Sequence, residues 1–219
     1  MHRANHHART PASRRRFAAH AIAGALVALP TSALSTSALA ASESAVFAGG
    51  CFWCVEEAFD KVEGVTDTTS GFSGGHTENP TYRQVVNGGT GHLEAVRVEY
   101  DPERVDYAEL LEVYWRNIDP FAVNRQFCDQ GASYRSAVFV DDEAQRQLVE
   151  ASRAALAERF DRDIATEILA AGKFYPAGEK HQNYYQNNPL RYRFYKSACG
   201  RVDRLEEIWG DEAEASSAP

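Results

Sequence analysis

Two cysteines three residues apart hold the densest potential chemistry of this sequence. Cys51 and Cys54 lie in the run GGCFWC at residues 49–54, whose glycines permit a sharp turn that leaves a sulfur uncovered. A cysteine at the first turn of a helix faces unpaired N–H groups and the positive end of the helix dipole, which favour the reactive thiolate. Phe52 and Trp53 add an apolar surface suited to a small apolar group. The alternative is a buried structural cysteine pair beside a core tryptophan.

The residues around this run predict a strand, a turn and a helix. Residues 45–48 are apolar and end at two glycines, whereas residues 52–61 carry apolar side chains at helical spacing. Further strands are predicted at 65–72, 94–100, 136–140 and 166–169, a loop at 74–83, and helices at 107–118 and 141–159 with Asp106 as an N-cap. Strands alternating with helices indicate a two-layer α/β or α+β domain.

Composition separates the chain into two unlike parts. The 219 residues are 44% hydrophobic and 25% charged with a net charge of -8, which excludes disordered, collagen-like, coiled-coil and multi-span membrane classes. The first forty residues hold five arginines and no acidic residue. Removing those five from 23 basic residues leaves 18 against 31 acidic ones, a balance of -13.

The basic segment has the organisation of an export signal. An uncharged run at 18–29 follows the arginines, and a small-x-small cleavage site ends at Ala40. The run is shorter than the roughly 20 residues of a membrane-spanning helix, which disfavours a permanent anchor. Residues 13–17, SRRRF, resemble a twin-arginine motif, with general secretion as the alternative. We expect a cleaved signal over 1–40, one catalytic domain over 41–219, and a periplasmic or other extracytoplasmic location.

All four cysteines lie in the expected mature part, at positions 51, 54, 128 and 199. An even cysteine count in an oxidising compartment is typical of structural disulfides. A chain of this length can bury a substantial core without them, so the count permits disulfides but does not require them.

Six motifs occur in an order that resembles the A-type peptide methionine sulfoxide reductases, from about residue 46 to residue 210. They are GCFW at 50–53, SGGH at 73–76, PTYR at 80–83, GHLEAV at 91–96, DQGASYRSA at 129–137 and HQNY at 181–184. We therefore expect an α+β fold, a two-layer α/β sandwich whose ferredoxin-like core has a mixed sheet and is followed by an extended C-terminal coil.

The resemblance implies a catalytic role for each matching residue. Cys51 attacks the sulfoxide sulfur and becomes a sulfenic acid. Glu94 donates a proton to the oxygen, provided that an apolar site raises its pKa. Tyr82 and Tyr134 donate hydrogen bonds to the same oxygen. The alternatives are a solvated edge charge for the glutamate and surface aromatics for the tyrosines.

Substrate contacts also follow from the resemblance. Phe52 and Trp53 hold the S-methyl group, and Asp129 hydrogen-bonds a peptidyl substrate. His92 and His181 receive no chemical step, so we expect structural hydrogen bonds for both. No metal and no organic cofactor is implied.

Resolution of the sulfenic acid rests on the remaining cysteines. The family more often has Gly at position 54 and Gln at position 133, where this chain has Cys54 and Ser133. Residues three apart on a helix lie close enough for a disulfide, so Cys54 is favoured as the resolving cysteine. Cys199 is the alternative resolver, or a relay of the disulfide outward, and Cys128 is interpreted as a small packed residue.

The expected activity is reduction of the S epimer of methionine sulfoxide, free or in oxidised envelope proteins. A thioredoxin-like protein is the expected electron donor, and we expect a monomer that binds no nucleic acid and makes no stable membrane insertion. Three other classes are weighed against it: a thioredoxin-like dithiol oxidoreductase, a structural zinc module built on the four cysteines, and a noncatalytic binding protein.

Overall fold

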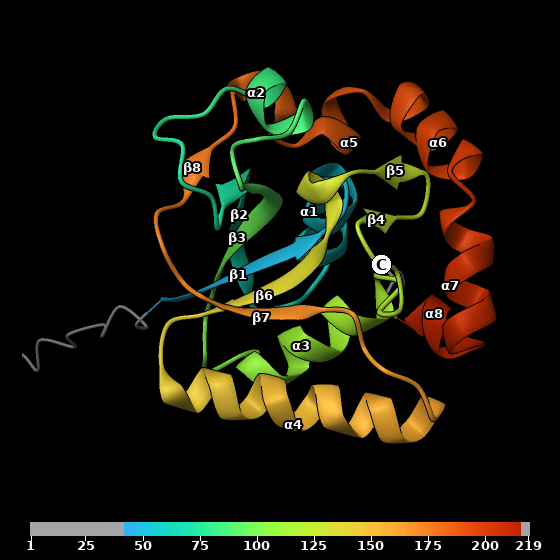
Figure 1. Ribbon diagram of the computed structural model, residues 1–219. Coiled ribbons are helices and arrows are strands. Elements are labelled where there is room, and N and C mark those ends of the chain that lie inside the picture. The colour runs from blue at the N-terminus through green and yellow to red at the C-terminus, as the bar shows by residue number, and fades with distance from the viewer. Residues whose placement is uncertain (1–41, 216–219) are drawn as a thin grey trace, which may run out of the picture. The chain divides into compact units, whose positions relative to one another are not determined.

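The computed structural model describes residues 42–215 (Figure 1). The expected signal over 1–40 and its cleavage site lie outside the described residues. Within residues 42–215, no helix is both long and apolar enough to cross a membrane.

A six-stranded mixed sheet forms the centre of the fold, in the order β7-β6-β1-β3-β2-β8. The strands are β1 (Glu43–Gly49), β2 (Val65–Ser73), β3 (Leu93–Tyr100), β6 (Ser136–Val140), β7 (Glu167–Ala170) and β8 (Tyr175–Pro176). All pairs are antiparallel except β6 with β7. The four inner strands and their two crossover helices follow the order β-α-β-β-α-β, which confirms the expected ferredoxin-like core.

Helices cover one face of this sheet. The main ones are α1 (Phe52–Asp60), α3 (Tyr107–Arg116) and α4 (Glu143–Phe160), and α3 lies beside α4 in Figure 1. Strand residues such as Phe47 and Val98 face these helices in the larger apolar core. The opposite face buries Ala48 and Ala95 beneath the segment that contains Leu169 and Phe174. Alternate residues of β1 thus enter different cores, as the period of a strand requires.

Helix starts follow the capping residues. Asp106 accepts a hydrogen bond from the Glu109 N–H, and the Glu109 side chain accepts one from the Asp106 N–H, which confirms the predicted cap. Thr81 and Gln84 form the same box at the start of the short helix α2 (Tyr82–Val86). This box sets the position of Tyr82 at the end of the predicted loop.

The C-terminal region is mostly helical, where a coil was expected. It contains the short α5 (Tyr184–Asn187), then α6 (Pro189–Ala198), α7 (Arg201–Trp209) and α8 (Glu212–Ala215). Helix α7 buries Leu205 and Trp209 in the main core, and α6 buries Tyr192 against Cys54. Helix α7 carries its apolar residues at helical spacing, whereas the pattern of α6 is weaker, so α6 depends more on tertiary packing.

Candidate active site

The junction of β1 and α1 places both nucleophilic sulfurs. Gly50 has a φ of +82°, and a Cβ there would lie 2.4 Å from the Gln126 Cβ, so only glycine fits this turn. Cys51 is the N-cap of α1, and Cys54 follows within the first turn. The predicted strand, turn and helix are confirmed.

Both thiols are buried, and they share a hydrogen bond. Burial raises the pKa of Cys51 well above its usual value, and the neighbouring Cys54 raises it further. The hydrogen bond with Cys51 lowers the pKa of Cys54 to about 6, although burial opposes this shift. Arg201, Tyr192 and Lys196 also stabilise the Cys54 thiolate. Both shifts act in the same direction, because they favour the thiol form of Cys51 and the thiolate form of Cys54.

Glu94 is a buried acid and not a solvated edge charge. Glu94 lies on β3 and is only 2% exposed. Its carboxyl group accepts a hydrogen bond from the Phe52 N–H at 3.1 Å. Burial raises the pKa of Glu94 to about 8, with a smaller contribution from Asp129. The carboxyl therefore carries a proton at neutral pH, directly beside the residue that follows Cys51.

Two phenols extend from this carboxyl. Tyr134, at the end of the 3₁₀ turn η1 (Ala132–Tyr134), interacts with Glu94 through its hydroxyl and also with Tyr82. Burial and the Glu94 charge raise the pKa of Tyr82 to about 12, and the same causes raise the pKa of Tyr134. Both hydroxyls remain protonated and able to donate hydrogen bonds. The structure thus brings the predicted acid and both phenols together.

Aromatic rings form a wall beside the sulfurs. Phe52 is fully buried and lies 6.3 Å from Trp53 between ring centroids. Trp53 is partly exposed and stacks face to face on Tyr184 at 3.7 Å, with 8° between the ring planes. Its other neighbours are His181 and Tyr195, both at 5.9 Å.

The two histidines differ in role. His92 accepts a hydrogen bond at Nδ1 from the Gly75 N–H and donates from Nε2 to the Thr77 carbonyl, as expected of a structural histidine. His181 is buried, yet neither ring nitrogen has a hydrogen-bond partner among the described residues. It is held instead by ring stacking, at 4.3 Å from Tyr82. The expected hydrogen bonding of His181 is wrong, because aromatic rings surround it.

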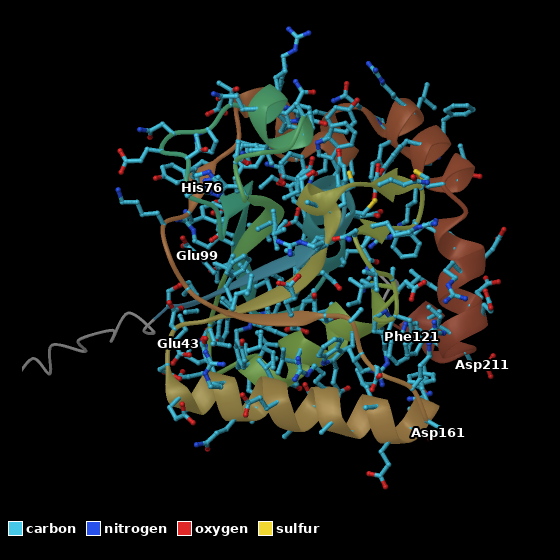
Figure 2. The ribbon with its side chains drawn as sticks, viewed as in Figure 1. Glu43, His76, Glu99, Phe121, Asp161 and Asp211 are labelled. Atoms are coloured by element: carbon cyan, nitrogen blue, oxygen red, sulfur yellow. A yellow bond between two sulfur atoms is a disulfide. The ribbon has the colours of Figure 1, made fainter. Side chains whose placement is uncertain are left out.

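Cys128 and Cys199 form a disulfide. Figure 2 draws sulfur atoms in yellow among the side chains of the fold. The hairpin of β4 (Arg125–Gln126) and β5 (Asp129–Gln130) supplies one cysteine, and the C-cap of α6 supplies the other. The interpretation of Cys128 as a simple packed residue is therefore wrong. The sulfur of Cys199, the alternative resolver, is bonded here and is not free.

A hydrogen bond of the site lies next to the disulfide. Asp129 follows Cys128, and it accepts a hydrogen bond of 2.5 Å from the Tyr195 hydroxyl, which also lies at the Cys51 thiol. The Cys199 N–H donates to the Tyr195 carbonyl one helical turn away. Within residues 42–215, this cluster of Cys128, Asp129 and Cys199 is the only group of three metal-type ligands, and its two sulfurs are bonded to each other.

A family model described as "Peptide methionine sulfoxide reductase" matches residues 43–213. The chain belongs to this family. It is a peptide-methionine (S)-S-oxide reductase, an enzyme that reduces the S epimer of methionine sulfoxide, free or in proteins, to methionine.

Known reductases match this chain in sequence and in structure over most of its length. A peptide methionine sulfoxide reductase MsrA of Bacillus licheniformis is 49% identical over 77% of this chain and 94% of its own length. A peptide methionine sulfoxide reductase MsrA 2 of Caulobacter vibrioides is 51% identical over 77% of this chain and 86% of its own length. The structure of methionine sulfoxide reductase A of Corynebacterium diphtheriae superposes with a TM-score of 0.63 and 38% identity, covering 68% of this chain and 76% of that one. The reduced form of Mxr1 of Saccharomyces cerevisiae superposes with a TM-score of 0.65 and 29% identity, covering 69% of this chain and 88% of that one.

Several residues of the reductase site were not found from the sequence. Tyr192, Tyr195 and Arg201 all act on the cysteine pair from the C-terminal helices. Their position depends on packing over long sequence distances, and the only signal was the aromatic character of that segment. Glu56 was also missed: both its carboxyl oxygens are buried without a hydrogen-bond partner among the described residues, and burial raises its pKa to about 7.

Proposed function

We propose that Cys51 is the nucleophile and that Cys54 first acts as its base. The proton of the Cys51 thiol passes along the shared hydrogen bond to the Cys54 thiolate. The Cys51 sulfur then attacks the sulfoxide sulfur, and Glu94 gives its proton to the oxygen as negative charge develops there. Methionine leaves, and Cys51 keeps the oxygen as a sulfenic acid.

The hydroxyls of Tyr82 and Tyr134 stabilise the developing charge by donating hydrogen bonds to the sulfoxide oxygen. Phe52 and Trp53 contact the S-methyl group. Asp129 is fixed by Tyr195 and accepts a hydrogen bond from the peptide N–H of the substrate.

Cys54 then resolves the intermediate. Its thiol, which gained the Cys51 proton, loses that proton to Glu94 and attacks the Cys51 sulfenic sulfur. As the disulfide forms, Glu94 returns this proton to the departing sulfenic oxygen, which leaves as water. Two electrons from a thioredoxin-like dithiol then restore both thiols. Cys199 is a weaker candidate for this step because Cys128 already occupies its sulfur.

We propose the cell envelope as the place of action, with the enzyme working there as a monomer on oxidised proteins. The support is the arginine-rich, acid-free segment over residues 1–40. A disulfide between residues 71 positions apart is also typical of an oxidising compartment.

The observation that carries this mechanism is the protonated, buried Glu94 bonded to the N–H next to Cys51. The test is single-turnover reduction of methionine S-sulfoxide without added reductant. Cys51→Ser should form no methionine. Cys54→Ser should still form methionine, limited to one per enzyme, because it retains the nucleophile. Methionine formation by the Cys51 variant at the wild-type rate would exclude this mechanism.

A further inference from the structure

A cavity of about 450 Å³ lies behind the aromatic wall of the active site. Its floor is apolar and is formed by Phe72, Tyr82 and His181, the three rings that surround Phe52 on that side. The mechanism above uses only the hydroxyl edge of Tyr82, so the cavity itself has no assigned role.

The cavity adjoins the catalytic centre at one residue, Tyr82. The Tyr82 ring lines it, while the Tyr82 hydroxyl lies with Tyr134 beside Glu94. Neighbouring Cα atoms of a peptide are about 3.8 Å apart, so a residue one or two positions from methionine sulfoxide can place its side chain here. A free amino acid has no such residue.

The rim of the cavity is positively charged. Arg83 on α2 and Lys180 on the 3₁₀ turn η2 (Glu179–His181) are both exposed and line it, and no acidic residue does. Within residues 42–215, neither cation forms an ion pair, although Lys173 nearby pairs with Glu78. Two unpaired cations at one rim contrast with a chain of net charge -8.

His181 forms part of the apolar floor. His181 lines the cavity, is 5% exposed, and has no hydrogen-bond partner for either ring nitrogen among the described residues. Burial and Lys180 lower its pKa, so the ring is neutral, with one donor and one acceptor nitrogen. Neither nitrogen is accessible from the cavity, so His181 contributes its ring to the apolar floor and no hydrogen bond to a ligand.

We propose that this cavity is a subsite for protein substrates that binds an acidic residue flanking methionine sulfoxide. The stem of that side chain contacts the apolar floor, and its carboxylate lies between Arg83 and Lys180. The inference rests on the proposed function and extends it to the choice of oxidised sites in proteins.

The test compares kcat/KM for peptides that carry Glu, Gln or Lys at each flanking position of methionine S-sulfoxide, relative to the free amino acid. Two exposed cations should favour Glu over Lys by about fivefold at low salt and less at high salt. Arg83→Glu combined with Lys180→Glu should reverse this preference, and the Gln variants should abolish it. Arg146→Glu reverses one charge, half the change of the double reversal, on α4 at the opposite end of Figure 1 from α2, and should leave the preference intact.

A Glu preference that is absent, or that persists unchanged in the double reversal, would overturn the proposal. A preference lost equally in Arg146→Glu would also overturn it, because net charge alone would then be the cause. Turnover of free methionine sulfoxide reports separately on the proposed mechanism, since it does not need the subsite.

Discussion

At the scale of single residues, the site depends on where protons are held. The sequence located Cys51, Cys54, Glu94 and the phenols, because each stands in a recognisable motif. It did not predict the contacts that lower the pKa of Cys54. Those contacts come from Cys51 and from Tyr192, Lys196 and Arg201, which reach the pair only through the folded C-terminal helices.

Glu94 should make the chemical step sensitive to alkaline pH. Burial raises its pKa to about 8, so the proton donor is present below pH 8 and is lost as the pH rises above it. The single-turnover rate at saturating substrate should fall through this range. Glu94→Gln cannot donate a proton, so its rate should be lower by about 100-fold or more, without the fall near pH 8.

The matched control is Glu56→Gln, which removes another buried carboxyl of raised pKa on the same helix as the cysteines. A fall near pH 8 that survives in Glu94→Gln would assign the proton to a different group.

At the scale of elements, the inner sheet and its helices were largely predictable. Alternating apolar residues in β3, the cap at Asp106 and the glycine turn before Cys51 are local signals. The packing of α6 and α7 and the bond between Cys128 and Cys199 were not predictable, because they join segments 71 positions apart. Cysteine spacing alone does not determine such a pairing.

The disulfide should act as a positioning device for Tyr195 and Asp129. Cys128→Ser and Cys199→Ser should each lower the free energy of unfolding by about 2–4 kcal/mol without reductant. Each should also lower kcat/KM for a peptide by about tenfold, because the Tyr195–Asp129 pair at Cys51 becomes less fixed.

The two single variants and the double variant should behave alike, since each removes the same bond. If the disulfide positions Tyr195 and Asp129, all three variants should lose the same amount of unfolding free energy and of kcat/KM. Loss of multiple turnover in Cys199→Ser alone, with Cys128→Ser unaffected, would instead make Cys199 a redox participant.

At the scale of the whole molecule, the sequence separates into an arginine-rich segment and an acidic catalytic part. If the first forty residues direct export, the protein recovered from the envelope should begin near residue 41, as N-terminal sequencing can show. Replacing Arg14 and Arg15 by Lys should block export by a twin-arginine route. Recovery of the full-length chain from the cytoplasm alone would contradict the export proposal.

We assign the four cysteines to two separate pairs, one catalytic and one structural. The most direct test is mass spectrometric mapping of disulfides after oxidation by methionine S-sulfoxide without reductant, with free thiols trapped by alkylation. We predict a new Cys51–Cys54 disulfide and an unchanged Cys128–Cys199 disulfide. A bond between Cys51 and Cys199, with Cys54 alkylated, would contradict this assignment of the cysteines.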